Sequence, residues 1–168
     1  MGLLHAWRWC PRCRAELDRG EGRVTCPVCG FVGYANSQPT ASAVVRDERG
    51  RVLLARRAGE PDAGKWDLPG GFLEEGEHPL DGLRRELLEE AGLEVEPLDL
   101  VAVEVDRYGE GEEAPATLNL YWTARAAAGE PRPADDVSEL RWFAPEELPP
   151  DGEIAFANVA RVLSRFRS

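Results

Sequence analysis

Residues 71–93, GFLEEGEHPLDGLRRELLEEAGL, contain a glycine-rich bend followed by the clearest helical pattern of the chain. Pro79 falls in the first turn of the expected helix and Gly92 follows its last residue, as is typical of helix ends. Apolar residues recur at helical spacing and form one stripe, which predicts packing against a sheet. The stripe consists of Leu80, Leu83, Leu87 and Ala91. We therefore expect a helix over residues 79–91.

Three carboxylates lie on one flank of this expected helix. With about 100° of rotation per residue, Glu86, Glu89 and Glu90 fall within an arc of about 100°. The helix contains no lysine to neutralise them, so the expected neutraliser is a hard cation with oxygen ligands, Mg²⁺ or Mn²⁺. Glu77 precedes the helix, where a carboxylate favours the positive end, and we expect it to pair with Arg85.

The fixed positions of this segment resemble the Nudix box. They are Gly71, Glu77, Arg85, Glu86, Leu87, Glu89, Glu90, Gly92 and Leu93. On these residues the chain is similar to Nudix hydrolases, which cleave nucleoside diphosphates linked to another group. The resemblance covers residues 40–168, and its box is the diagnostic part. It implies the α/β class, with an α/β/α sandwich around a mixed sheet.

The resemblance also implies roles for individual residues. The ligands of a catalytic Mg²⁺ or Mn²⁺ would be the side chains of Glu86, Glu89 and Glu90, with the carbonyl group of Gly71 as a further ligand. Glu77 and Arg85 would orient the helix. Arg56 and Arg57 are candidates for phosphate contacts, with surface ion pairing as the alternative.

The general base differs among members of the family. We favour one of the glutamates of the box, and an acidic residue of a later loop is the alternative. The loop candidates are Glu110, Glu112, Glu113, Asp135, Asp136 and Glu139. For any one of them, a solvated loop position is the simpler interpretation.

The remaining patterns predict strands and two more helices. Strands are expected over residues 41–46, 51–56, 98–105, 117–126 and 139–143, with the first two joined by the turn 47–50. A short helix is expected after Pro145 and an amphipathic helix over residues 153–166. Strands followed by a helix, more strands and a last helix predict a mixed sheet with helices on its faces.

All four cysteines lie near the start of the chain. They form two Cys-x2-Cys pairs, Cys10 with Cys13 and Cys26 with Cys29. Such pairs supply four sulfur ligands for a tetrahedral structural Zn²⁺, because every coordination position is then filled by protein. The alternatives are two disulfides or four reduced thiols. We expect a zinc ribbon over residues 1–35 and a Nudix hydrolase domain over residues 36–168.

The composition restricts the class of partner. The net charge of −11 does not suit a protein that binds nucleic-acid phosphates, although a bound divalent cation still allows a small phosphate substrate. No apolar run approaches the ~20 residues of a membrane helix, and the first residues do not form a signal peptide. We expect a cytoplasmic protein with a small-molecule nucleotide substrate and neither a nucleic-acid nor a membrane partner. The resemblance allows a homodimer.

A zinc ribbon ahead of a Nudix domain is similar to the branch that contains NADH diphosphatases and enzymes acting on ADP-ribose or FAD. The NADH branch carries a Ser-Gln-Pro array after its box, whereas the one such tripeptide here, residues 37–39, precedes the box. The sequence therefore favours Mg²⁺-dependent hydrolysis of ADP-ribose or a related ADP-linked compound such as FAD or an ADP-sugar. The alternatives are an NADH diphosphatase, a nucleoside triphosphate diphosphohydrolase, and a metabolite-sensing regulator that binds nucleic acid.

Overall fold

The structure, a computed structural model, describes residues 3–109, 111 and 114–167. The chain divides into two compact units. One comprises Met1–Ser37 with Arg107–Ala116, and the other comprises Gln38–Asp106 with Thr117–Ser168. Each unit is described by itself.

The first unit contains a small antiparallel sheet. After a 3₁₀ turn, η1 (Leu3–Ala6), the strands are β1 (Asp18–Gly20), β2 (Arg23–Thr25) and β3 (Val32–Tyr34), and β2 lies between the other two. The hydrophobic cluster of this unit is small and consists of Leu4, Cys10, Leu17, Val24 and Cys26. Because two of these five are cysteines, the unit has little apolar material with which to stabilise itself.

The second unit is built on a mixed sheet. Its strands are β4 (Gln38–Arg46), β5 (Val52–Arg57), β6 (Trp66–Asp67), β7 (Gly70–Phe72), β8 (Glu94–Arg107), β9 (Ala116–Ala128) and β10 (Val137–Phe143). The main order is β10-β5-β4-β9-β8, with β6 paired to β5 and β7 paired to β4. The β4–β9 pair is parallel, whereas β4 and β5 are antiparallel.

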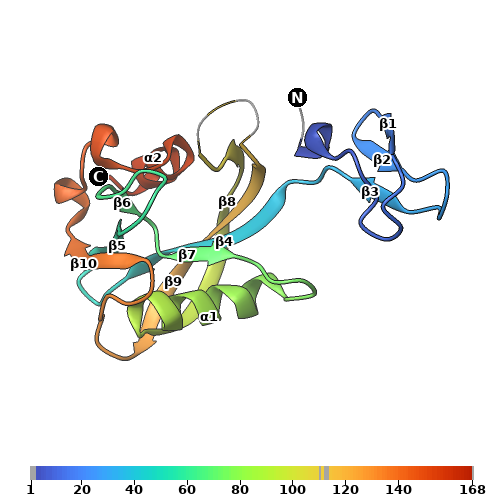
Figure 1. Cartoon of the computed structure of the whole chain (residues 1–168). Helices are drawn as coiled ribbons and strands as arrows, with labels where there is room; N and C mark the ends of the chain where they lie inside the picture. The colour runs from blue at the N-terminus through green and yellow to red at the C-terminus, as the bar shows by residue number, and fades with distance from the viewer. Residues whose placement is uncertain (1–2, 110, 112–113, 168) are drawn as a thin grey trace. The chain divides into compact units, whose positions relative to one another are not determined.

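Helices cover both faces of this sheet (Figure 1), with α1 (Pro79–Ala91) on one side and α2 (Ala157–Leu163) on the other. Alternation along β4 explains the two layers, because successive side chains of a strand point to opposite faces. Ala43 and Val45 pack in the cluster that contains α1, and Val44 packs in the cluster that contains α2. The expected α/β/α sandwich around a mixed sheet is confirmed.

The carboxyl-terminal helix is shorter than the sequence predicts. We expect it over residues 153–166, but α2 begins at Ala157, and 3₁₀ turns lie before it (η3, Asp151–Glu153) and after it (η4, Ser164–Phe166). Ile154 instead forms a β-bridge with Trp66, and the N–H of Ala155 donates to the carbonyl of Trp66 at 2.8 Å. Tertiary pairing therefore overrides the helical pattern there.

The other short helix is also less regular than expected, because the segment after Pro145 forms a 3₁₀ turn, η2 (Pro145–Glu147). Among the described residues, no helix combines the length and the apolar character needed to cross a bilayer.

Candidate functional site

Helix α1 is fixed at both ends by the residues that bound it in the sequence. The Nδ1 atom of His78 accepts a hydrogen bond from the N–H of Leu80 at 3.3 Å, so His78 is the N-cap. Gly92 ends the helix in the left-handed conformation with φ of 64°, which favours glycine. Leu83 and Leu87 are fully buried under the sheet. The opposite flank of the helix therefore presents the acidic residues.

Arg85 connects three of the carboxylates. Its Nε and Nη2 atoms each lie 2.9 Å from an oxygen of Glu77, and its Nη1 atom lies 2.7 Å from Glu86 and 3.1 Å from Glu89. Arg85 also donates to the carbonyl of Phe72 at 3.1 Å. One guanidinium thus ties the loop before α1 to the helix and neutralises part of the charge. The expected pair of Arg85 with Glu77 is present, whereas its contacts with Glu86 and Glu89 were not expected from the sequence.

The charges on Glu77 and Arg85 reinforce each other. Hydrogen bonds from Arg85 hold the pKa of Glu77 at about 2, and the same contacts raise the pKa of Arg85. The box holds four carboxylates, of which Arg85 contacts Glu77, Glu86 and Glu89, whereas Glu90 accepts from the N–H of Gly70. When all are ionised, the cluster has an excess of negative charge.

Glu90 is the buried member of the cluster. Its side chain is enclosed, with 8% of the residue exposed, and its Oε2 atom accepts a hydrogen bond from the N–H of Gly70 at 2.9 Å. Burial raises the pKa of Glu90 to about 9, and the nearby carboxylates of Asp136, Glu86 and Asp67 act in the same direction. Without a cation, Glu90 is therefore protonated near neutral pH.

Two glycines bring the backbone close to these groups. A Cβ atom on Gly71 would lie 2.4 Å from a carboxylate oxygen of Glu86. Gly70 has φ of 139°, and a Cβ there would lie 2.2 Å from the carbonyl oxygen of Ala41. The missing side chain of Gly71 lets the bend approach Glu86, and that of Gly70 lets it pass close to the backbone of β4.

A small cleft beside Glu90 contains two further carboxylates and one arginine. It is lined by Asp67 and Gly70 from the β6–β7 bend, by Arg57 from β5, and by Asp136 ahead of β10. Burial raises the pKa of Asp67 to about 7, whereas Arg57, whose Nη1 atom lies 3.5 Å from Asp67, acts to lower it. Asp67 was missed as a site residue. Its signal is a carboxylate in the otherwise apolar run 66–69, WDLP.

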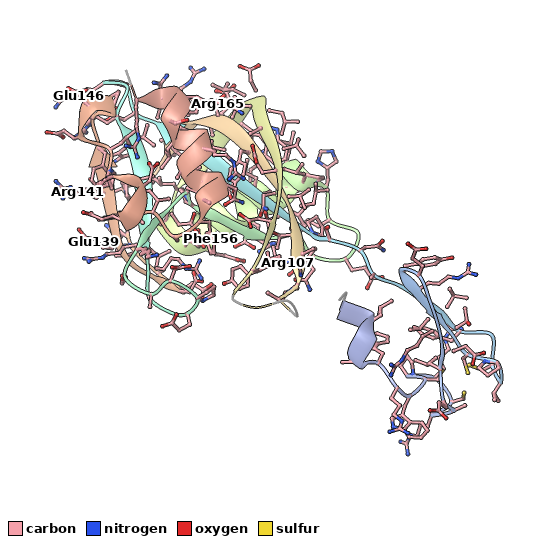
Figure 2. All side chains as sticks on the ribbon, turned by 90° about the horizontal axis from the view of Figure 1, so that it is seen from above. Arg107, Glu139, Arg141, Glu146, Phe156 and Arg165 are labelled. Atoms are coloured by element: carbon pink, nitrogen blue, oxygen red, sulfur yellow. The ribbon has the colours of Figure 1, made fainter. Side chains whose placement is uncertain are left out.

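The loop acids named as alternative bases differ in position. Asp136 lies in the cleft with Glu90. Asp135 is exposed. Glu139 on β10 pairs with Arg56 at 3.2 Å, and Figure 2 shows it along the same strand as Arg141. The other three candidates, Glu110, Glu112 and Glu113, lie outside the described residues.

The two candidate phosphate contacts also differ, since Arg56 pairs with Glu139 and donates to the carbonyl of Gly64 at 2.7 Å. Arg57 faces the cleft beside Glu90, where it pairs with Asp67 at 3.5 Å and donates to the carbonyl of Pro61 at 2.7 Å.

The four cysteines form a second cluster. Each sulfur of the first Cys-x2-Cys pair lies close to one sulfur of the second. The Sγ atoms of Cys10 and Cys29 are 3.6 Å apart, and those of Cys13 and Cys26 are 3.4 Å apart. All four sulfur atoms lie within 4.8 Å of one another, and all four cysteines are free. This set could hold one metal ion.

The two Cys-x2-Cys turns repeat each other. The N–H of Arg14 donates to the carbonyl of Cys10, and the N–H of Gly30 donates to that of Cys26, at 2.9 and 3.0 Å. Gly30 has φ of 73° and Arg14 has φ of 63°. Both turns thus end on a left-handed residue, which glycine adopts readily and Arg14 adopts as one of the few non-glycine residues of this kind among the described ones.

Comparison with known proteins agrees with this geometry. The NUDIX domain model matches residues 36–163. NAD-capped RNA hydrolase NudC of Stutzerimonas stutzeri is 31% identical over 84% of this chain and 50% of its own length. The same-named protein of Vibrio vulnificus is 31% identical over 99% of this chain and 63% of its own length. The chain thus spans about half to two thirds of these two relatives.

A solved structure extends the comparison to both units. The crystal structure of a NUDIX hydrolase from Nitrosomonas europaea is 31% identical, covers 95% of this chain and 90% of its own, and superposes with a TM-score of 0.79. Together with the match of the NUDIX domain model, the sandwich fold and the complete box, this shows that the chain belongs to the Nudix hydrolase family.

Proposed function

We propose that the protein hydrolyses the diphosphate linkage of an ADP-linked compound with the help of a divalent cation. The observation that carries the proposal is the enclosed carboxylate of Glu90, which accepts a hydrogen bond from the N–H of Gly70 and lies near Glu86. Protein interiors rarely retain such a group without a partner of opposite charge.

The residues present fit a hard cation. The side chains of Glu86, Glu89 and Glu90 offer carboxylate oxygens, which Mg²⁺ and Mn²⁺ prefer. Among the described residues, only the four sulfur atoms converge closely enough to hold an ion as placed, since Arg85 holds the carboxylates of Glu86 and Glu89, so a cation would have to displace these contacts. The raised pKa of Glu90 fits as well, because a cation would replace the proton that burial and neighbouring carboxylates hold there. We assign the ligands to Glu86, Glu89, Glu90 and the carbonyl group of Gly71.

The residues around the cation would then have separate tasks. When bound, Mg²⁺ or Mn²⁺ shields the charge of the diphosphate and lowers the pKa of a coordinated water. Arg85, held by Glu77, fixes the carboxylates of Glu86 and Glu89. Arg57 faces the cleft and is the better placed of the two candidate phosphate contacts.

We retain one of the box glutamates as the general base. It would accept the proton of the water that attacks phosphorus. Asp136 is the loop alternative, because among the described loop acids it is the one that lines the cleft with Glu90.

The cysteine cluster fits a structural Zn²⁺. Four sulfur atoms at about 2.3 Å from a tetrahedral ion lie about 3.8 Å apart, and the two cross-pair distances of 3.6 and 3.4 Å are close to that value. All four ligands come from the chain, so this ion would stabilise the first unit and take no part in hydrolysis. This arrangement differs from two disulfides, because the sulfur atoms lie 3.4 and 3.6 Å apart, whereas an S–S bond is about 2.05 Å long.

For the substrate we place NAD(H) first and ADP-ribose second. Two relatives with 31% identity carry the name NAD-capped RNA hydrolase, which moves the preference away from ADP-ribose, the first choice of the sequence analysis. The absence of a Ser-Gln-Pro array after the box instead favours ADP-ribose over NAD(H). A direct comparison of products is therefore the decisive experiment.

Purified protein with Mg²⁺ would be incubated separately with NADH, ADP-ribose, FAD and a nucleoside triphosphate, and the products separated by chromatography. We expect NADH to give AMP and reduced nicotinamide mononucleotide faster than ADP-ribose gives AMP and ribose 5-phosphate. Faster hydrolysis of ADP-ribose would reverse the order of substrates. Release of inorganic diphosphate from the triphosphate as the fastest reaction would instead identify a triphosphate diphosphohydrolase. No hydrolysis of any of these compounds would favour a metabolite-sensing regulator.

A further inference from the structure

One edge of the second unit's sheet exposes apolar side chains. Strand β8 is the last strand of the main order, so its outer side is an edge of the sheet. Leu98 and Leu100 of this strand are 48% and 52% exposed. Because they are two residues apart on one strand, their side chains point to the same face. Two half-exposed leucines at a sheet edge are typical of a surface that contacts another protein.

These leucines lie on the face of the sheet that carries α2. Arg46 of β4 stacks on the ring of Phe166, which packs against the cluster that contains α2. Arg125 of β9 is the register partner of Arg46, so the two side chains share this face. Glu96 of β8 lies 3.8 Å from Arg125 and is on the same face. Leu98 follows Glu96 by two positions and therefore points the same way.

A groove of about 530 Å³ lies beside these side chains, at the end of β4. Its available side chains are Arg46, Glu48, Leu98 and Arg125. Two more acidic residues line the groove, but Asp47 is ion-paired within its own turn at 2.7 Å. The other, Asp99, follows Leu98 directly, so its side chain points to the opposite face. The groove thus joins apolar and charged groups on one face.

The available charges at this groove have both signs. In the part of the chain that the structure describes, Arg46 and Glu48 form no ion pair. The pair of Arg125 with Glu96 joins two exposed side chains and contributes little within one copy. An acidic partner would leave the glutamates without a counter-charge, and a basic partner would leave the arginines. A surface with two charges of each sign beside leucines is complementary to itself, which favours a second copy of this chain.

We propose that two copies of the chain associate through this region of the second unit, the edge surface. It consists of Arg46, Glu48, Glu96, Leu98, Leu100 and Arg125. Because β9 lies between β4 and β8, a twofold axis along β9 exchanges the positions of these two strands. The axis brings Arg46 of one copy over Glu96 and Leu98 of the second copy, and the reciprocal contact forms at the same time.

The edge surface is separate from the hydrolytic site. Gly70 and Gly71 of that site pair with Ser42 and Ala41 of β4. Arg46 lies four residues beyond Ser42, which is about 13 Å along a strand. Association at the edge surface therefore uses none of the box carboxylates, and it does not depend on the proposed substrate.

The first test measures the oligomeric state of the full chain by sedimentation velocity over a range of protein concentrations. We expect the wild-type protein to form a dimer. In L98S/L100S the dissociation constant of the dimer should rise at least about tenfold, because the apolar part of the contact is removed. V103S/V105S is the matched control. It removes two exposed apolar side chains from the same strand, but at positions that point to the opposite face, so its dissociation constant should equal that of the wild type.

The second test exchanges the charges that meet across the axis. R46E alone brings two glutamates together, and E96R alone brings two arginines together, so each should raise the dissociation constant at least about tenfold. In R46E/E96R the opposite charges face each other again. We expect this double variant to return to within about threefold of the wild type, which is the signature of direct coupling between the two positions.

Several outcomes would overturn the proposal. One is a wild-type protein that stays monomeric at every concentration, which would leave the groove to a partner of another kind. A second is an equal effect of L98S/L100S and V103S/V105S. A third is growth beyond two copies, because an isologous contact closes on itself. A fourth is failure of R46E/E96R to recover the association lost in the single variants. Circular dichroism checks the fold of each variant, and a misfolded protein could not produce that recovery.

Discussion

The two candidate metal sites of this protein differ in how the chain prepares them. The cysteine cluster has four sulfur atoms within 4.8 Å of one another, and they come from two turns of the same design. The carboxylate cluster has acidic groups in unequal surroundings, from the enclosed Glu90 to the half-exposed Glu89, and Arg85 holds two of them. The first arrangement offers four ligands from the chain, two buried and two exposed, which could fill every coordination position of an ion, as suits stability. The second leaves part of its surroundings open, as a reaction requires.

This difference has a physical consequence for the apo protein. A carboxylate cluster can lower its own repulsion by taking up a proton, as Glu90 does through its raised pKa, or by pairing with Arg85. The first unit has no comparable substitute, because two of its five core residues are themselves cysteines. Loss of metal should therefore affect activity at one site and folding at the other.

The largest expected effect is that of E90Q on hydrolysis. The amide has the shape of the protonated side chain but carries no charge for a cation, so we expect the Mg²⁺-dependent rate to fall by a factor on the order of 100 or more. The measurement is the steady-state rate against Mg²⁺ concentration. E75Q, which removes an exposed charge of the preceding loop, is the matched control and should be close to wild type. Retention of more than about a tenth of the wild-type rate would contradict the assignment of Glu90.

The second-largest expected effect concerns the cysteine cluster. We expect C13S to lose stoichiometric zinc, and the first unit to become susceptible to protease within residues 1–37, because the metal supplies much of the folding free energy of so small a core. Zinc analysis and limited proteolysis give the measurement, and hydrolysis by the second unit should continue. If the wild-type protein contains no zinc when purified without chelators, the structural role assigned to the cysteines is wrong.

The third effect tests the close approach of backbone and carboxylate. In G71A the new Cβ would meet the Glu86 carboxylate at 2.4 Å, so the carboxylate must move while the helix stays in place. We expect the Mg²⁺ concentration for half-maximal activity to rise about tenfold, with little change in melting temperature. G59A is the control, because a Cβ there meets nothing within 4 Å. Equal metal dependence of the two variants would show that Gly71 is not part of the site.

The sequence predicted the local features of this site and missed the long-range ones. The bounds of α1 agree with the expected range 79–91, because its cap residues and apolar stripe are encoded within the segment itself. Asp67 was not identified, because its proximity to Glu90 depends on the pairing of β6 with β5 and on the bend at Gly70. The shortened last helix has a similar cause, since Ile154 bridges to a strand far away in the sequence.

The partners that neutralise the carboxylates were also only partly predictable from the sequence. Spacing alone placed three carboxylates on one flank and excluded lysine as their partner. It did not indicate that Arg85 would contact Glu86 and Glu89 in addition to Glu77. A side chain with several donors can satisfy several neighbours at once, and which neighbours it reaches depends on rotamers that spacing does not specify.

The smallest expected effect is a pH dependence of stability that should appear only without metal. The pKa of Glu90 is about 9 in the fold against 4.5 as its ordinary value, so between these values the folded chain holds a proton that the unfolded chain releases. Unfolding free energy must then decrease as pH rises from about 5 to 9. We expect the melting temperature of the metal-free wild-type protein to fall by several degrees over this interval.

The same titration separates Glu90 from the rest of the cleft. In E90Q the side chain cannot ionise, so its share of the decrease should disappear and leave a smaller slope from Asp67, whose pKa is raised to about 7. Saturating Mg²⁺ should also flatten the wild-type curve, because the bound cation stabilises the ionised form. A metal-free slope that is identical in wild type and E90Q would mean that Glu90 is already ionised in the apo protein. The carboxylate cluster would then not relieve its repulsion by taking up a proton on Glu90, and the contrast between the two sites would fail at this point.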